Sequence, residues 1–377
     1  MLINPMRSWS NKNRNSASAY LLGQNNIITI GKNIDIEIDP RLELLTAVQL
    51  WTTWARPGQF GDIGERATPY MTKLKKFMKR FQKSDAVRIS EFLLNSGFSF
   101  DAPPNLILST RNGLAFDPPA EGYSSYLVER GQGETNLDDF LEALRKLAAK
   151  SRFDKFFEAH RGYYRQMTDR QAAFMKAERN SQWLHGWFGG SRERRFHCIF
   201  SPAMMPGGVY GATIVRREQG TDVTHIYQII RDAERCAPAY LNSLTLHEFG
   251  HSFVNPAIGD QVEKLRAATR RTLGKIFEPV RSRMEKMAYP ELETFLNEAV
   301  VRAATIRALF SLGDIDEAGV EKKLQAEADR GFYCIDAVYL LLVEYESNRD
   351  KWPDFISYGP ELLERLAANT DQLIPDS

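Results

Sequence analysis

Residues 247–251 read His-Glu-Phe-Gly-His, and this segment constrains the chain more than any other. In a helix, side chains four residues apart leave the same face one turn above each other, so His247 and His251 can reach one ion. Zinc binds imidazole nitrogens at about 2.0–2.1 Å in tetrahedral geometry. Glu248 can reach a water molecule on the metal and act as a general base. The segment therefore predicts a zinc-binding helix; the alternative is a pair of core histidines hydrogen-bonded to backbone groups.

The flanking residues predict how this helix begins, ends and packs. Pro238 suits a first helical turn, and Asn255-Pro256 predicts the stop. Gly250 costs about 1 kcal/mol relative to alanine inside a helix, so we expect it to serve close packing beside the site. Helical spacing predicts that the histidines lie half-buried on an apolar stripe. This stripe consists of Tyr240, Leu244, His247, His251 and Val254.

Length, charge and cysteine content exclude several classes of protein. A chain of 377 residues and 43.0 kDa is long enough for one large domain or two ordinary ones. Lys and Arg number 49 against 48 Asp and Glu, so there is no global basic excess with which to neutralise phosphates. We therefore expect no general nucleic-acid or membrane-surface role. The three cysteines are widely spaced and predict neither a disulfide framework nor a cysteine-based zinc site.

The first 26 residues are polar and rich in serine and asparagine, and we expect a flexible segment there. Their longest apolar stretch, residues 19–22, is too short for the core of a signal peptide or for a membrane span. We therefore expect a soluble protein that is cytoplasmic by default, or secreted or periplasmic if a targeting segment has been removed. The sequence makes no prediction of the oligomeric state.

Hydrophobic periodicity divides the rest of the chain into a mainly helical part, residues 27–190, and a catalytic part, residues 191–377. In the second part, short strands precede the histidine helix and only helices follow it. This order is typical of an α+β fold, mostly helical, with a small mixed or antiparallel sheet packed against the histidine helix. Predicted strands cover 27–30, 34–38, 195–200, 209–216 and 223–230. Predicted helices cover 41–54, 68–82, 84–95, 137–150, 151–179, 261–287, 291–311, 316–329, 332–349 and 360–373.

One predicted helix is strongly basic. Residues 73–81 read Lys-Leu-Lys-Lys-Phe-Met-Lys-Arg-Phe, with cations on one side and apolar residues on the other. A solvated helix face is the simpler interpretation of this pattern, and contact with an anionic partner is the alternative.

A catalytic zinc needs a third protein ligand and an open position for water. The metzincin pattern requires a glycine and a histidine where this chain has Val254 and Ala257, so that class is excluded. Asp260 lies beyond the predicted helix stop and is poorly placed. Glu298 lies on a later amphipathic helix, at the border of its apolar face, where either a ligand or a solvated glutamate can sit. The spacing alone does not decide between these two roles.

The order HExxH followed by Asn297-Glu298-Ala299 on a second helix resembles the gluzincins, the class of thermolysin-like peptidases. The resemblance implies that His247, His251 and Glu298 are the metal ligands. One departure concerns the residue four positions after the glutamate. Thermolysin-like enzymes have an aspartate there that supports a metal-binding histidine, whereas this chain has Arg302. The partner that orients the histidines is therefore not predicted.

Most of the chain is also similar to an uncharacterised bacterial family of HExxH proteins, known as a domain of unknown function and expected to be zinc metallopeptidases. The similarity rests on residues 38–45, 247–256, 297–303 and 345–351, of which the second segment is the most specific. It implies a zincin-like, thermolysin-type catalytic half and supplies no substrate.

These observations predict a zinc-dependent metallopeptidase of gluzincin type. We expect one Zn²⁺ per chain, a peptide or protein substrate, and Glu248 as the general base that activates the attacking water. Two alternatives stay open, namely a zinc hydrolase of a non-peptide bond and an inactive, peptidase-like interaction protein. The intact Glu248 argues against the inactive protein, because a protein without catalysis has no chemical need for that carboxylate.

Two supporting features have weaker signals. The oxyanion that forms during hydrolysis needs one more donor, and the candidates are Tyr333 above all, then Tyr210 and His225; a buried core role is the alternative for each. Substrate can add as a strand along Tyr210 and Gly211, where Gly207-Gly208 and Gly211 allow a close approach of its backbone. The alternative interpretation of the same residues is a hairpin turn followed by a packed strand. Three further histidines lack a partner at ligand spacing and are expected to be structural: His160, His185 and His197.

Overall fold

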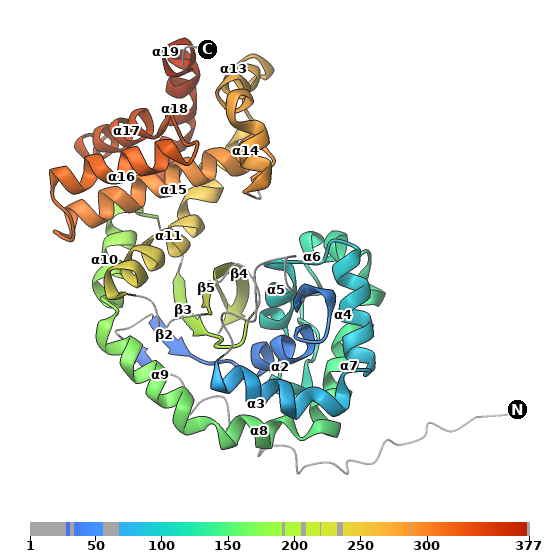
Figure 1. Cartoon of the computed structure of the whole chain (residues 1–377). Helices are drawn as coiled ribbons and strands as arrows, with labels where there is room; N and C mark the ends of the chain where they lie inside the picture. Colours follow the sequence, from blue (N-terminus) through green and yellow to red (C-terminus); the bar gives the residue numbers. More distant parts are fainter. Residues whose placement is uncertain are drawn as a thin grey trace, which may run out of the picture. The chain divides into compact units, whose positions relative to one another are not determined.

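The computed structural model describes residues 28–30, 34–55, 68–190, 193–204, 209–218, 220–231, 237–287 and 289–374. The predicted flexible segment, residues 1–26, lies outside this part. The described chain has the predicted α+β fold, with many helices and one small mixed sheet (Figure 1). None of the helices in the described part combines the length and the apolarity that crossing a membrane requires.

The chain folds as two compact units that draw on interleaved segments. The first, which we call the helical unit, comprises Ile28 and the described residues within 37–169 and 200–208. The second, the sheet unit, comprises residues 29–36, 170–199 and 209–377. The chain therefore passes between the units several times.

The helical unit is built around α2 (Pro40–Gln49), which is buried along nearly its whole length. Asp39 caps this helix by accepting a hydrogen bond from the Arg41 N–H at 2.7 Å, and Pro40 occupies the first helical turn. Helices α3, α4, α5 and α7 pack around it (Figure 1). The elements of this unit are α2, η1 (Thr53–Ala55), α3 (Pro69–Met78), η3 (Lys79–Phe81), α4 (Asp85–Asn95), α5 (Ala102–Ser109), η4 (Gly113–Ala115), α6 (Ser125–Arg130), α7 (Glu134–Ser151), α8 (Phe153–Ala159) and α9 (Arg161–Phe174) as far as Asp169.

A buried carboxyl group lies in the core of this unit. Glu43 on α2 has no exposed surface, and its neighbours are hydroxyl groups. Tyr70 and Ser201 both donate hydrogen bonds to the carboxylate, the latter at 2.6 Å, and the Tyr70 hydroxyl also pairs with that of Tyr164 at 2.7 Å. Burial outweighs these hydrogen bonds and raises the pKa of Glu43 to about 7.

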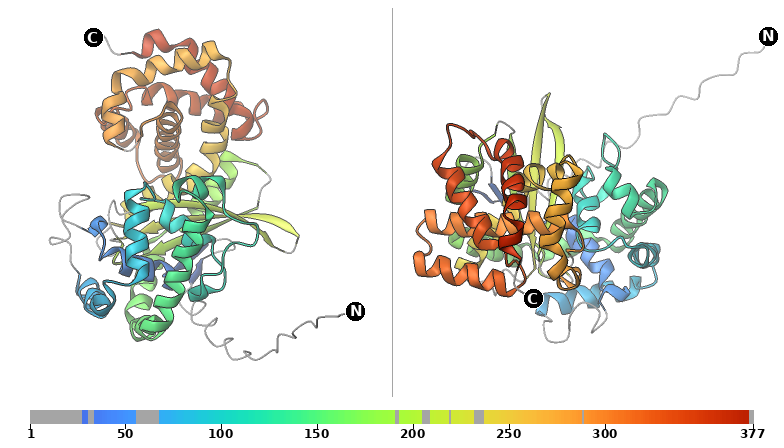
Figure 2. Two further views of the ribbon diagram at one scale, coloured as in Figure 1. Left: turned by 90° about the vertical axis from the view of Figure 1, so that its right-hand side faces the viewer. Right: turned by 90° about the horizontal axis from the view of Figure 1, so that it is seen from above.

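The sheet has five strands in the order β1-β2-β3-β5-β4, which leaves β4 at an edge. β4 and β5 form an antiparallel hairpin whose register runs from Val209↔Ile230 to Glu218↔Thr221. Gly220, in the turn, has a φ of +87°, which glycine adopts without strain. The hairpin is long, and its far end stands clear of the helices of the sheet unit in both views of Figure 2. The strands are β1 (Ile28–Ile30), β2 (Ile34–Glu37), β3 (Arg194–Phe200), β4 (Val209–Glu218) and β5 (Thr221–Ile230).

One face of the sheet packs on α11 (Pro238–Ala257), the histidine helix. Gln228 of β5 accepts a hydrogen bond from Thr245 of α11 at 3.1 Å, and the ring of Phe196 in β3 stacks on Phe249 at 4.5 Å. Because side chains alternate along a strand, His225 of β5 points from the opposite face. The prediction that the sheet packs against the histidine helix is confirmed.

Four other helices of the sheet unit, α10, α12, α15 and α18, pack closely on α11. A Cβ atom added at Gly250 would lie 2.9 Å from Val301 Cγ2 of α15, which confirms the predicted packing role of this glycine. A Cβ at Gly359 of α18 would lie 1.9 Å from the carbonyl oxygen of Ala257. Besides α11, the helices of this unit are the end of α9, α10 (Ala177–Phe188), α12 (Gly259–Val262), α13 (Ala267–Phe277), η6 (Glu278–Val280), α14 (Arg281–Lys286), α15 (Leu292–Ser311), α16 (Glu317–Asp329), α17 (Ile335–Ser347), α18 (Phe355–Ala368) and α19 (Thr370–Leu373).

The end of α10 is held by residues of α17 and the turn that follows it. Tyr345 donates a hydrogen bond to the Trp187 carbonyl at 3.1 Å, and Arg349 donates to the same carbonyl. Glu346 accepts from the Trp187 indole N–H at 2.7 Å and also pairs with Arg307 of α15. Residues 345–349 therefore join three helices of the sheet unit.

Candidate metal centre

α11 carries His247, Glu248 and His251, and its ends differ slightly from expectation. Pro238 begins the helix as predicted, but the helix continues past the predicted stop to Ala257. Pro256 is tolerated because it lies one residue from the end, where a single backbone hydrogen bond is lost. The predicted place of Tyr240 on the buried stripe is wrong, since 55% of its surface is exposed. The buried face contains Leu241, Thr245, Phe249 and Phe253, so both histidines lie at its margin.

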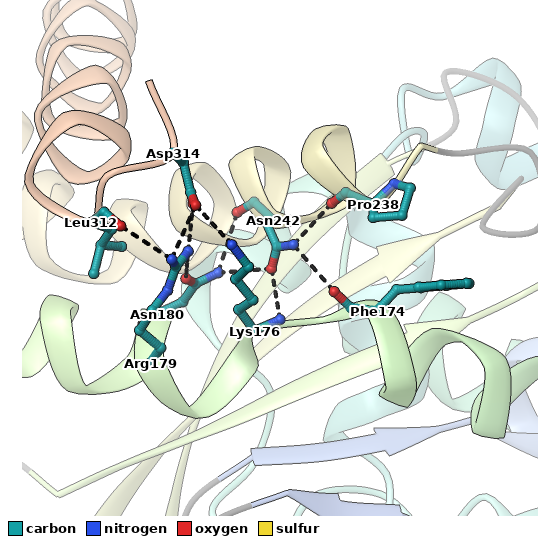
Figure 3. A network of polar contacts seen from close by, with 8 residues as sticks. All are labelled: Phe174, Lys176, Arg179, Asn180, Pro238, Asn242, Leu312 and Asp314. Carbon is teal, nitrogen blue, oxygen red and sulfur yellow. Dashed lines mark hydrogen bonds and ion pairs between the residues drawn. The ribbon is translucent and has the colours of Figure 1, made fainter. Parts of the chain in front are cut away.

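A polar network fixes the start of α11 and the end of α15 to α10 (Figure 3). The buried Asn242 donates to the Pro238 carbonyl at 2.9 Å and accepts from the Lys176 backbone N–H at 2.8 Å. The Lys176 ammonium group also pairs with Asp314, just beyond α15, at 2.9 Å, and Arg179 forms a second ion pair with that carboxylate. The two helices that carry the predicted ligands are therefore anchored to a common support.

Three side chains converge between α11 and α15. His247 Nε2 and His251 Nε2 are 3.3 Å apart, while Glu298 Oε1 lies 3.2 Å from His251 Nε2 and Oε2 lies 3.7 Å from His247 Nε2. Ligand atoms about 2.1 Å from a tetrahedral ion are separated from one another by about 3.4 Å. In the described part of the chain, these three residues form a cluster of histidine and carboxylate side chains whose ligand atoms lie within 4.8 Å of one another and could hold a metal ion.

The site is half-closed and strongly polarised. The side chains of His247, His251 and Glu298 are 16%, 23% and 10% exposed to solvent. Burial lowers the pKa of His247 to about 3. Burial opposes protonation of His251 too, but the hydrogen bond and the charge of Glu298 outweigh it and raise the pKa of His251 to about 9. Burial would raise the pKa of Glu298, yet the neighbouring histidines and Arg302 hold it far below its usual range. The site thus favours a positive charge between these three side chains.

Asn255 orients one of the histidines. Its side-chain Oδ1 lies 3.1 Å from His251 Nδ1, one helical turn further along α11. An amide oxygen only accepts, so Nδ1 carries the hydrogen and Nε2 points toward His247 and Glu298. Sequence reasoning interpreted Asn255 as part of a helix stop; its spacing of four residues from His251 was the signal that identifies its role.

Arg302 supports the glutamate. Its Nε and Nη2 atoms donate to Glu298 Oε2 at 3.0 and 2.8 Å, and its Nη1 donates to Glu327 at 2.8 Å. The guanidinium group also lies over the ring of Phe332, 4.6 Å from its centroid. The residue that departs from the thermolysin pattern is therefore a partner of the glutamate, and it leaves Glu298 Oε1 directed at His251.

Residues 34–365 match the model of a protein family described as Domain of unknown function (DUF4932). The chain belongs to the DUF4932 family. Neither a curated protein nor a solved structure is similar enough to count as a match. The DUF4932 region contains both compact units almost entirely and all of the residues that converge between α11 and α15.

Tyr289 is a polar residue of this DUF4932 site that sequence reasoning missed. It lies in the short link before α15, and its hydroxyl oxygen accepts a hydrogen bond from Arg302 Nη2 at 3.3 Å. Burial and the charges of Glu298 and Glu248 raise the pKa of Tyr289 to about 12. Its hydroxyl is thus protonated at neutral pH and is a hydrogen-bond donor. The link has no periodicity, so the sequence held no signal for this residue.

The three predicted oxyanion donors lie elsewhere. Tyr333 donates to the backbone carbonyl of Ile276. Tyr210 pairs with Ile229, which points away from α11, so the Tyr210 side chain lies on that far face of the sheet. His225 lies on the same far face, where its nitrogens pair with Glu218 at 2.7 Å and with His197 at 2.9 Å. The fold brings none of the three to the histidines.

One predicted substrate-strand glycine lies beside Glu248, the predicted general base. Gly211 pairs with Gln228, whose side chain points toward α11, and a Cβ added at Gly211 would lie 3.4 Å from Glu248 Oε2. Burial raises the pKa of Glu248 to about 7. Gly208 lies outside the described residues. Edge strand β4 therefore runs past the Glu248 carboxylate with no side chain between them at this position.

Proposed function

We propose that this chain is a zinc-dependent hydrolase of gluzincin type, and most directly a metallopeptidase. The observation that carries the proposal is the set of spacings of 3.2, 3.3 and 3.7 Å among the nitrogens of His247 and His251 and the oxygens of Glu298. Two imidazoles and one carboxylate form the donor set of the His₂Glu zinc sites of metallopeptidases. Asn255 and Arg302 supply the outer hydrogen bonds that such ligands need.

The residues around the donor set divide the chemistry between them. A zinc ion held by His247, His251 and Glu298 would supply the Lewis acid that makes a water molecule acidic near neutral pH. Glu248 takes the proton of the attacking water and passes it to the leaving amine. Tyr289, whose O–H group is fixed from one side by Arg302, donates a hydrogen bond to the oxyanion, the role that the sequence suggested for Tyr333.

A peptide substrate is supported by the sheet. β4 is an edge strand, and Gly211 lies on the α11 side of it, next to Glu248. An extended peptide that added to this edge would present its backbone to the carboxylate, and specificity would come from alternate side chains. Hydrolysis of a non-peptide bond and a binding role without catalysis are the competing outcomes of the test.

The test measures bound metal and peptide cleavage in the same set of variants. Elemental analysis of wild type should give about one zinc per chain, retained in Glu248→Gln and strongly reduced in Glu298→Ala. The matched control is Glu293→Ala, also on α15, whose partner is the exposed Arg270; it should keep both metal and activity. A mixed peptide library should be cleaved by wild type and by the control alone.

Each competing function has its own signature. Zinc content that is indifferent to Glu298 would refute the ligand assignment. Stoichiometric zinc with no peptide cleavage, but with hydrolysis of esters or amides of small molecules, would favour the non-peptide hydrolase. Zinc binding without hydrolysis of any substrate would favour the binding protein.

A further inference from the structure

A basic cavity lies in the helical unit, between the connection from η3 to α4 and the second half of α7. It has a volume of about 420 Å³. Phe81 and Leu147 form an apolar wall, and the polar lining consists of Arg80, Lys83, Ser84, Asp85, Lys146 and Lys150. Ligand cavities in proteins are typically about 300–1,000 Å³, so this one suits a small ligand.

The charge of this cavity is largely uncompensated. Residues 68–84 include six cations and no carboxylate, in a chain whose net charge is only +1. Among the described residues, no carboxylate lies within ion-pair distance of Arg80, Lys83 or Lys150. Lys146 lies 3.4 Å from Glu142, and the single acid of the lining, Asp85, is paired with Arg88. A solvated helix face does not require cations from two separate helices to share one cavity.

Ser84 gives this cavity an unsatisfied donor. It occupies the N-cap position of α4, where a serine side chain usually accepts a hydrogen bond from the first turn, but it makes no such bond. Its Oγ atom is buried and has no hydrogen-bond partner in the described structure. The first N–H groups of α4 also lack intrahelical partners, as at any helix start. An anionic oxygen in the cavity would give these N–H groups an acceptor, and would serve the Ser84 hydroxyl once its side chain rotates toward the cavity, since its oxygen is closed to solvent as it lies.

We propose that this cavity binds a phosphate monoester. A phosphate group carries close to two negative charges and several acceptor oxygens, which match the cations and the Ser84 hydroxyl, whereas a carboxylate would leave most of these donors unused. The apolar wall of Phe81 and Leu147 receives the organic part of the ester. The same chemistry describes a soluble phosphorylated metabolite and the headgroup of a phosphatidic-acid-type lipid. The proposal does not depend on the metal centre.

The binding experiment uses the full chain and two kinds of probe. Calorimetric titration with inorganic phosphate and with glycerol phosphate tests the soluble source, and co-sedimentation with phosphatidylcholine vesicles, with and without phosphatidic acid, tests the lipid source. Because phosphate also binds metal ions, each titration is repeated with Glu298→Ala. We expect saturable binding of one monoester per chain that Glu298→Ala leaves unchanged. Binding in either arm supports the proposal, and the arm identifies the source.

Matched variants show whether the cavity is responsible. Lys83→Gln combined with Lys150→Gln should weaken binding at least tenfold, and Ser84→Ala should weaken it several-fold, since both remove hydrogen bonds to a charged ligand. The control combines Lys73→Gln with Lys76→Gln, which removes the same charge from α3 outside the cavity, and should change affinity less than about twofold. Equal losses in the two double variants would show diffuse attraction and overturn the proposal, as would absence of binding to every probe.

Discussion

Two buried glutamates, one in each unit, differ in what surrounds them. Glu43 in the helical unit meets the hydroxyls of Tyr70 and Ser201, and burial raises its pKa to about 7. Glu298 in the sheet unit meets two histidines and Arg302, and its pKa lies far below the usual range. Burial is similar, so the difference comes from the partners. Hydroxyl groups satisfy a carboxyl without charging it, whereas three cationic or metal-binding groups hold it ionised. The first arrangement suits a core and the second suits a cation site.

The largest expected loss of stability comes from removing Arg302, the cation that pairs with Glu298. Arg302→Met leaves the carboxylates of Glu298 and Glu327 without their shared partner. Loss of one member of a buried ion pair costs about 3–5 kcal/mol, which chemical denaturation measures. The control Arg270→Met breaks an exposed pair with Glu293 and should cost less than about 1 kcal/mol. Equal costs would show that Arg302 does not compensate buried charge.

The second effect is a pH dependence that belongs to Glu43. Its pKa is raised from the usual 4.5 to about 7, so the folded chain holds the proton more tightly than the unfolded chain. The stability that Glu43 contributes is therefore fully present below pH 4.5. This contribution falls by about 3 kcal/mol in total as the pH rises to 7 and beyond. Glu43→Gln should remove the share of this slope that Glu43 contributes to denaturation curves measured between about pH 5 and 8. Glu248, whose pKa burial also raises to about 7, contributes a similar share that remains.

The control for this slope is Glu142→Gln, a change at a more exposed carboxyl, which should leave it unchanged. Ser201→Ala removes one of the two hydroxyl donors that favour the ionised form, and should shift the slope to higher pH. A slope in Glu43→Gln that is as steep as in wild type would assign the titration to other groups, such as Glu248.

The third effect tests the close approach of α11 and α15 that brings Glu298 to its partners. Gly250→Ala places a methyl group 2.9 Å from Val301 Cγ2. Overpacking costs about 1–3 kcal/mol, and the better helix propensity of alanine recovers up to about 1. We expect a net loss of about 1–2 kcal/mol, smaller when combined with Val301→Ala because that change makes room. Gly274→Ala on α13 meets no atom within 4 Å and should stabilise the chain slightly. Identical effects of the two alanines would contradict close packing at Gly250.

The sequence alone could predict those features of the fold and the site that depend on residues close together along the chain. HExxH identifies a face of one helix because the spacing of four is a property of any helix, and Gly250 signals close packing because glycine is unfavourable there. The Asn-Glu-Ala segment suggested Glu298 only through a resemblance. Tyr289 reaches Arg302 from the link before α15, and Tyr333 points to Ile276 instead, so no spacing along the chain identified these two roles. Arg302 lies one helical turn after Glu298 on α15, but the resemblance drew attention to it only as a departure from the thermolysin pattern. The face of the sheet on which Tyr210 lies depends on the strand register, which the amino-acid sequence did not determine.

Replacement of Asn255 is expected to have the smallest effect on folding stability but a clear effect on metal affinity. Asn255 is exposed, so Asn255→Ala should change the free energy of unfolding of the metal-free chain by less than about 0.5 kcal/mol. It removes the acceptor for the Nδ1 hydrogen of His251, and loss of such an outer contact weakens metal binding about 10–100-fold. Chelator competition measures this change. Asn255→Asp keeps an acceptor and should retain the affinity, while Asn95→Ala in the helical unit controls for loss of an amide. Unchanged affinity in Asn255→Ala would mean that the rigid approach of α11 and α15, rather than this hydrogen bond, orients His251.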